Sequence, residues 1–194
     1  MSFDESDLSW SRRALLKAGG AFAFGAALAE PSFAGGSNVV EVRGFDFLHG
    51  RWQVVHRKLR ERLVGNTEWF EFPGTLTVAP ILGGLGNFDQ NVLSDPKGTY
   101  EASSLRLFNP HQKQWSIWWF DARLPGLDPP VVGGFQGKKG TFYSRDVFKD
   151  RPIRVRTTYE PLTPQRAQWT QAFSPDDGLT WEVNWIMDFN RESA

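Results

Sequence analysis

The 194-residue sequence contains no cysteine and only three histidines. The absence of cysteine excludes disulfides, thiolate zinc sites, iron–sulfur clusters and a cysteine nucleophile. The histidines, His49, His56 and His111, are far apart in the sequence, and no two of them have the spacing of metal ligands, so no metal site is predicted. The Gly-x-Ser-x-Gly nucleophile motif and recognisable cofactor motifs are also missing, and the sequence predicts no catalytic residue and no cofactor.

The chain has no excess of charge of either sign, with 22 basic and 22 acidic residues. We therefore do not expect nucleic acids or anionic membranes as partners. After residue 34 no apolar run is long enough to span a membrane as a helix, so no integral membrane segment is expected there.

The N-terminal segment has the pattern of an export signal. Arg12 and Arg13 are followed by apolar residues and Lys17, and then by an uncharged run of small and apolar residues from 18 to 29. This order is typical of a twin-arginine signal peptide, whose arginine pair is recognised by the export machinery. Ser32-Phe33-Ala34 is a small-x-small cleavage site. Residues 1–34 are therefore predicted to be a helical signal segment, and the mature protein is expected in the bacterial periplasm or outside the cell.

Residues 35–194 are predicted to form one all-β domain, because apolar and polar residues alternate between turn sequences at intervals of roughly 8 to 15 residues. Only residues 42–49 are expected to form a short helix or turn, with Phe45 and Leu48 packing beneath the end of a sheet. Strands in sequence-neighbour order with short connections favour an antiparallel up-and-down barrel of about ten strands, with a two-layer sandwich as the alternative. The expected strand segments are 50–63, 67–72, 75–79, 87–93, 100–108, 114–121, 131–136, 141–148, 153–160, 166–173 and 180–190.

Four motifs carry a family resemblance: Phe-Leu-His-Gly-Arg-Trp at 47–52, Leu-Gly-Gly-Leu-Gly-Asn at 82–87, Leu-Arg-Leu-Phe-Asn-Pro at 105–110 and Trp-Glu-Val-Asn-Trp at 181–185. From about Phe45 to Arg191 the chain resembles DUF1579-like bacterial proteins of the calycin group, which includes lipocalins, fatty-acid-binding proteins and nitrobindins. The resemblance implies a ten-stranded barrel with an internal cavity, and it implies no reaction. Nitrobindin-type proteins hold haem through a histidine late in the chain, and this sequence has none after His111, so haem is not expected.

Aromatic and polar residues within the predicted strands are the candidate ligand-binding side chains. Eight of the nine tryptophans follow residue 34, which fits either a thick core or an aromatic-lined cavity. His56 alternates with Trp52 and should share its face. Arg106 and Arg156 are candidates for binding a carboxylate or polar head group, as an arginine does in fatty-acid carriers, and the alternative is an internal ion pair with Glu71 or Asp121. The full candidate set is Trp52, His56, Trp69, Glu71, Arg106, Trp115, Trp119, Arg156, Trp169 and Trp185.

Together these features predict an exported β-barrel protein that binds a small, partly apolar molecule in an aromatic-lined interior. Two alternatives stay open. The first is a periplasmic enzyme that uses the same cavity, with His56 or a carboxylate as the acid–base group. The second is a structural or interaction protein whose barrel is filled by its own side chains. The sequence favours a binding protein over an enzyme.

Overall fold

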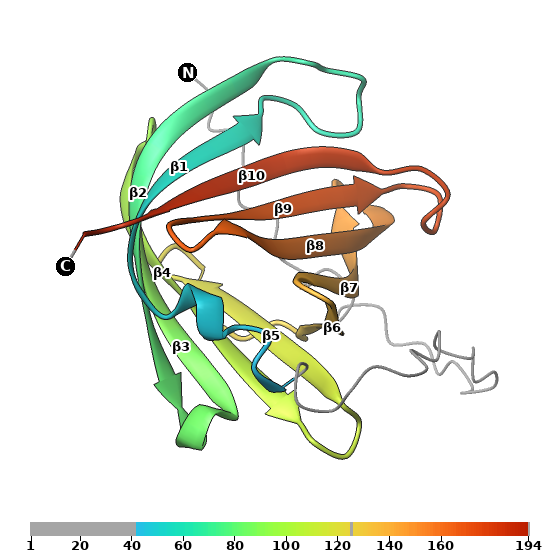
Figure 1. Ribbon diagram of the computed structural model, residues 1–194. Helices are drawn as coiled ribbons and strands as arrows, with labels where there is room; N and C mark the ends of the chain where they lie inside the picture. The colour runs from blue at the N-terminus through green and yellow to red at the C-terminus, as the bar shows by residue number, and fades with distance from the viewer. Residues whose placement is uncertain (1–41, 125, 194) are drawn as a thin grey trace.

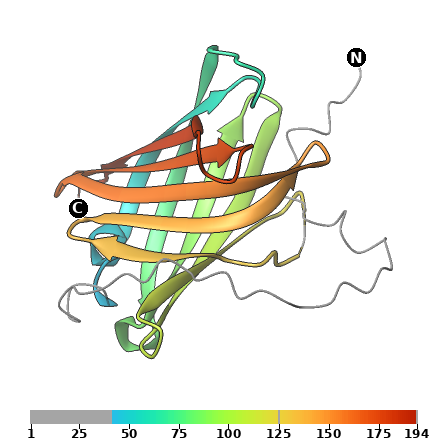
Figure 2. The ribbon, with the colours of Figure 1, turned by 90° about the vertical axis from the view of Figure 1, so that its right-hand side faces the viewer.

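The computed structural model of the protein describes residues 42–124 and 126–193. The predicted signal segment and its cleavage site lie outside these ranges. Within them, ten strands form one closed antiparallel barrel, which confirms the barrel over the sandwich (Figures 1 and 2). The strands are β1 (Gly50–Leu59), β2 (Trp69–Ile81), β3 (Gly86–Asp95), β4 (Gly98–Asn109), β5 (Gln114–Asp121), β6 (Val131–Gln136), β7 (Lys139–Phe148), β8 (Arg151–Thr163), β9 (Arg166–Ser174) and β10 (Glu182–Arg191).

The barrel is closed by pairing between the first strand and the last. Each strand is hydrogen-bonded to its sequence neighbours, and β1 also pairs with β10, so that Val54 lies opposite Phe189 on one side and Gly74 on the other. Closure of this kind leaves no unpaired outer strand, which is the physical reason that a meander of this length curls up. No helix among the described residues is long and apolar enough to cross a membrane.

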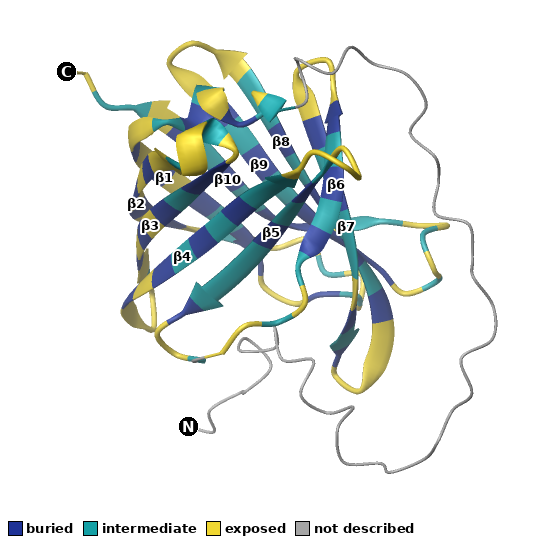
Figure 3. Cartoon of the chain, turned by 90° about the horizontal axis from the view of Figure 1, so that it is seen from below, coloured by how far each residue is buried: buried dark blue, intermediate teal, exposed yellow. Residues whose placement is uncertain are grey.

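Alternation of side chains divides every strand into an inner and an outer face. In β2, Phe72, Gly74, Leu76 and Val78 are buried, and the residues that alternate with them are exposed. Figure 3 shows alternating bands of buried and exposed residues on β3, and of buried and intermediate residues along most of β4. Inward residues of opposite walls meet in one large hydrophobic cluster, and a second, smaller cluster consists of Phe148, Ile153, Val155 and Phe173.

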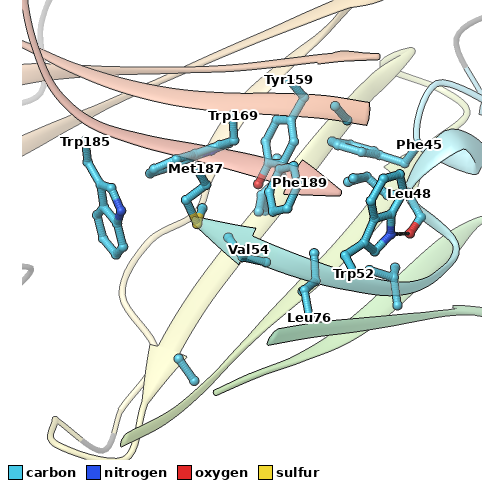
Figure 4. Packing of buried hydrophobic residues seen from close by; sticks show 14 of the residues in the cluster. Phe45, Leu48, Trp52, Val54, Leu76, Tyr159, Trp169, Trp185, Met187 and Phe189 are labelled. Atoms are coloured by element: carbon cyan, nitrogen blue, oxygen red, sulfur yellow. Dashed lines mark hydrogen bonds between the residues drawn. The ribbon is translucent and has the colours of Figure 1, made fainter. Parts of the chain in front are cut away.

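The segment before β1 covers one end of the barrel, as expected. A 3₁₀ turn, η3 (Asp46–Leu48), follows Phe45, and both Phe45 and Leu48 are fully buried. The Trp52 indole Nε1 donates a hydrogen bond to the Leu48 carbonyl oxygen at 2.7 Å, drawn as a dashed line in Figure 4. Arg191 holds the same segment from the far end of the chain, since its guanidinium donates to the carbonyl oxygens of Phe47 and His49, each at 2.6 Å.

Three details of the predicted strands are wrong. The segment 50–63 was expected to be one strand, but β1 ends at Leu59. Segments 67–72 and 75–79 are parts of the single strand β2, which runs straight through Pro73-Gly74. The β2–β3 ladder begins at Gly74, so Pro73 is paired on the β1 side alone, a position that tolerates the missing N–H. Gly74 is needed for space, because a Cβ there would lie 2.6 Å from His56 Nε2.

The third error concerns the beginning of the last strand. Strict alternation through the expected strand 180–190 would place Trp181 and Val183 on the same face as Trp185, but a β-bulge between Val183 and Trp185 changes the alternation there. Asn184 is the extra residue of this bulge and is completely buried, whereas Val183 is 38% exposed. A bulge places two residues opposite one on the neighbouring strand, so strict alternation fails at that point.

Candidate functional site

A cavity lies inside the barrel beside the ring of Trp185. Its volume is about 40 Å³, which is room for a few water molecules and much less than the hundreds of Å³ of a typical ligand site. The hydrophobic core around it contains both aromatic and aliphatic side chains. The cavity is lined by Leu76, Asp89, Asn91, Ser104, Arg106, Ile117, Trp119, Asp128, Pro129, Val131, Asp146, Thr157, Tyr159, Trp169, Trp185, Met187 and Phe189.

The cavity reaches the loop between β5 and β6. The ladder between these strands has only three residue pairs, from Trp115 opposite Gly133 to Ile117 opposite Val131. The loop supplies Asp128 and Pro129 to the cavity lining, and Pro129 is exposed. The cavity lining therefore includes an exposed residue on this side of the barrel.

The walls on the β9 and β10 side are aromatic. The rings of Trp169 and Trp185 meet edge to face with centroids 5.3 Å apart, and Trp119 from β5 approaches Trp185 at 6.1 Å. Figure 4 shows Trp185 at one end of the cluster and Phe45, Leu48 and Trp52 at the other, with Trp169, Met187 and Tyr159 between them. Rings in this arrangement offer flat apolar surface to a ligand.

A buried ion pair forms the polar part of the lining. The Arg106 Nη2 and Asp89 Oδ2 atoms are 2.6 Å apart, and the two side chains are 3% and 1% exposed. Arg106 also donates to Asn87 Oδ1 at 2.9 Å and to the Tyr159 hydroxyl at 3.4 Å. Asp89 Oδ1 accepts hydrogen bonds from the Ser104 N–H at 2.7 Å and from Asn91 Nδ2 at 2.6 Å.

The surroundings keep this pair ionised. Burial alone would lower the pKa of Arg106, but Tyr159 and Asp89 outweigh it and raise that pKa, so the guanidinium stays charged. Burial raises the pKa of the Tyr159 hydroxyl, which therefore stays protonated. The internal ion pair predicted as an alternative for Arg106 is thus present, but its partner is Asp89, whereas Asp121 pairs with Arg123 at 2.9 Å.

His56 faces inward beside Trp52 and Val54, as its alternation predicts, and is 1% exposed. Its Nδ1 accepts a hydrogen bond from Trp185 Nε1 at 3.3 Å, and its ring is stacked on Phe72 with centroids 4.6 Å apart. Burial, with a smaller contribution from the charge of Lys58, lowers the pKa of His56 from 6.5 to about 3. The imidazole is therefore neutral at physiological pH, and Nδ1 is occupied as an acceptor.

Three further buried polar residues have atoms without any hydrogen-bond partner. The atoms are Thr157 Oγ1 and both side-chain amide atoms of Gln171 and of Asn184. The residues are 2%, 1% and 0% exposed, respectively. Thr157 lines the cavity, and Gln171 lies between Thr157 and Trp185 in the sheet register.

The structure brings most of the predicted site residues to the interior. Trp119, Trp169, Trp185 and Arg106 line the cavity. Trp52, His56 and Trp115 are buried in the core around it.

For Trp69, Glu71 and Arg156 the expectation of an inward side chain is wrong. Trp69 and Glu71 are exposed on the outer face of β2, and Arg156 lies on the outer face of β8, between the inward residues Val155 and Thr157. The guanidinium carbon of Arg156 lies 4.4 Å from the centroid of the Trp181 ring. In both strands the alternation separates a mostly apolar face from a polar one, and Glu71 and Arg156 belong to the polar face. The sequence therefore contained the signal that these two side chains point outward.

Asp89 and Tyr159 were missed among the candidates. Asp89 belongs to the alternating series Asn87, Asp89 and Asn91, which faces Arg106, Ser104 and Ala102 across the β3–β4 ladder. The series was visible in the sequence, but its placement inside the barrel depends on the register. Among residues 42–124 and 126–193, no group of three or more His, Asp or Glu side chains is placed to hold a metal ion.

This chain resembles known proteins in its fold and not in its sequence. Twelve chains of known structure match it. One is the S-type phycobiliprotein lyase CPES from Guillardia theta, with a TM-score of 0.52 and 9% sequence identity, covering 77% of this chain and 91% of that chain. At this identity the match establishes a calycin-like barrel and no shared function. No family model and no curated protein sequence matches the chain, so the resemblance to DUF1579-like proteins stays a prediction.

Proposed function

We propose that the barrel binds a small, partly apolar molecule in the cavity beside Arg106 and Asp89. The observation that carries this proposal is a cavity that combines an aromatic wall, a buried ion pair and lining residues from the loop between β5 and β6. A protein of the same fold is a phycobiliprotein lyase, which supports a role for this scaffold beyond a filled structural core.

The volume of the cavity limits the ligand. A cavity of about 40 Å³ accommodates only a molecule with few non-hydrogen atoms unless side chains move. A larger ligand requires displacement of a ring, and Trp119, which is only partly buried, is the ring best placed for this. The same small volume favours the filled-core barrel as the competing function.

An enzyme that uses His56 as its general base receives no support from the geometry. The imidazole is not part of the cavity lining, and its pKa of about 3 makes it a weak base near neutral pH.

Tryptophan fluorescence tests the binding proposal, because Trp119, Trp169 and Trp185 line the cavity. The protein is titrated with fatty acids, haem and small aromatic metabolites, and at least one is expected to change the emission saturably. Ser104→Leu, which fills the cavity, should weaken that binding about tenfold or more, because added carbon atoms exclude the ligand. Ser103→Leu, on the outer face of the same strand, is the matched control and should leave the affinity unchanged. No response to any compound would leave the filled-core barrel as the function.

We also propose that the protein works outside the cytoplasm after twin-arginine export. The proposal is supported by the arginine pair and the cleavage pattern of residues 1–34. Replacement of Arg12 and Arg13 by lysine should retain the full-length protein in the cytoplasm, whereas Arg43→Lys should not. Fractionation of a bacterial host that has the twin-arginine machinery measures this, and cytoplasmic retention of the wild-type protein would contradict it.

A further inference from the structure

We infer that the polar group of the ligand is uncharged and carries both a hydrogen-bond donor and an acceptor, as a carboxamide does. The inference rests on the proposed binding function and assigns the polar contacts to Thr157, Gln171 and Asn184. It replaces the carboxylate head group that the sequence suggested for Arg106.

Unpaired polar atoms mark this subsite. Five buried side-chain atoms on Thr157, Gln171 and Asn184 have no hydrogen-bond partner in the protein. Buried polar atoms are nearly always paired, so a group of unpaired ones in one place calls for a partner from outside the chain. The three residues offer hydroxyl, amide N–H and amide carbonyl groups, which together can both accept from and donate to a ligand.

The register places these residues side by side next to the cavity. Thr157 on β8 lies opposite Gln171 on β9, and Gln171 lies opposite Trp185 on β10. Thr157 and Trp185 both line the cavity, and Gln171 lies between these two lining residues in the register without being part of the lining itself. Asn184 is the extra residue of the bulge beside Trp185 and is fully buried.

The charged pair in the same cavity disfavours a carboxylate ligand. Arg106 already contacts Asp89 at 2.6 Å and Asn87 at 2.9 Å. An incoming carboxylate would have to compete with Asp89 and bring a second negative charge into a region of low dielectric constant. A neutral amide avoids that cost and pairs with the side chains that lack partners.

Pairs of compounds that differ only in the polar group test this inference. Benzamide is compared with benzoate, and decanamide with decanoate, at pH 7, with dissociation constants from ligand-observed NMR or tryptophan fluorescence. At least one amide should bind about tenfold or more tightly than its acid, because each unmatched hydrogen bond costs about this factor. Gln171→Leu should remove most of that preference, and Gln90→Leu on the exposed outer face of β3 should not.

Thr157→Val is a nearly isosteric second variant and should act in the same direction as Gln171→Leu, which keeps the test decisive if that variant folds poorly. If neither the amides nor any compound of the fluorescence panel binds, both the proposed function and the inference fail. If compounds bind but an acid matches or exceeds its amide, or the preference survives both substitutions, the inference is wrong and the binding function stands.

Discussion

Arg106 and Asp89 show how a charge is tolerated inside a barrel at the scale of single residues. Each charge offsets part of the electrostatic cost of burying the other, and neighbouring polar groups pair with Arg106 Nη1 and Asp89 Oδ1, whereas Arg106 Nε has no hydrogen-bond partner among the described residues. Such a pair adds little net stability, but the loss of one partner leaves an isolated buried charge.

Arg106→Met should therefore lower the free energy of unfolding by about 3–5 kcal/mol, because Asp89 is then buried without a counter-charge. Adding Asp89→Asn should restore a large part of this loss, since the neutral amide oxygen still accepts the Ser104 N–H. Urea denaturation of the single and double variants measures the coupling. Arg60→Met is the control, because its exposed pair with Glu68 contributes less than about 1 kcal/mol. If Arg60→Met and Arg106→Met lowered the free energy of unfolding equally, burial of the Arg106–Asp89 pair would not increase the cost of losing one partner.

His56 predicts how stability depends on pH. Its pKa is about 6.5 when unfolded and about 3 in the folded protein, so below pH 6.5 the unfolded state binds a proton that the native state does not. The contribution of His56 is fully present above pH 6.5 and is lost as the pH falls toward 3, a change on the order of 5 kcal/mol.

Replacement of His56 by phenylalanine should flatten this dependence. At pH 7 the variant should lose about 1–3 kcal/mol, because the buried Trp185 N–H loses its acceptor. Between pH 6.5 and 4 its stability should fall less steeply than that of the wild type, as measured by urea denaturation at several pH values. His111→Gln, at an exposed turn, should keep the wild-type slope. An unchanged slope in His56→Phe would mean that other groups cause the acid sensitivity.

At the scale of single residues, the sequence predicted which way a side chain points better than it predicted which residue that side chain pairs with. Alternation with Trp52 placed His56 inside, and apolar neighbours placed Arg106 inside, both confirmed by burial. The partner Asp89 lies 17 residues before Arg106 in the chain, and only the β3–β4 register brings the two together. Arg156 was misplaced although it alternates with Val155 and Thr157 and lies on the polar face of β8 with Arg154 and Glu160, so the phase of the alternation already placed it outside.

At the scale of strands, the ends of a strand were predictable where a clear turn sequence lies next to them. Segments 114–121 and 131–136 match β5 and β6, since Asn-Pro and Gly-rich turns bound them clearly. Pro73-Gly74 has the same composition as a turn but serves another purpose, because Gly74 leaves room for the His56 ring. Local sequence cannot distinguish a glycine required for a turn from one required by a neighbouring strand.

Adjacent glycines in β6 give a test at this scale. A Cβ on Gly133 would overlap the carbonyl oxygen of Thr141 on β7, whereas a Cβ on Gly134 would meet nothing within 4 Å. Gly133→Ala should therefore destabilise the protein by about 1–3 kcal/mol through strain at the β6–β7 ladder. Gly134→Ala should stay within about 0.5 kcal/mol of the wild type. Thermal unfolding of both variants measures the difference, and similar melting temperatures would contradict the close approach of β6 and β7.

At the scale of the whole molecule, the barrel has one end closed by a segment outside the strand meander. Phe45 enters this end and contacts rings from β5, β6 and β8, with centroids 4.9 Å from Trp115 and Phe135 and 5.0 Å from Tyr159. Its ring centroid also lies 5.3 Å from the guanidinium carbon of Arg106. The closure of this end and the polar part of the cavity are therefore linked through one side chain.

Phe45→Ala should lower the free energy of unfolding by about 3–5 kcal/mol, because it removes a buried ring and leaves a void next to Tyr159 and Arg106. Benzene should bind that void and raise the melting temperature of the variant, since a ligand that binds only the native state stabilises it. Differential scanning calorimetry with and without benzene measures both effects. Phe120→Ala removes a ring from the outer face, where Phe120 contacts Phe88, and should show a smaller loss and no response to benzene. A variant at position 45 that melts like the wild type would mean that the strands alone, and not the segment at the closed end, hold the interior together.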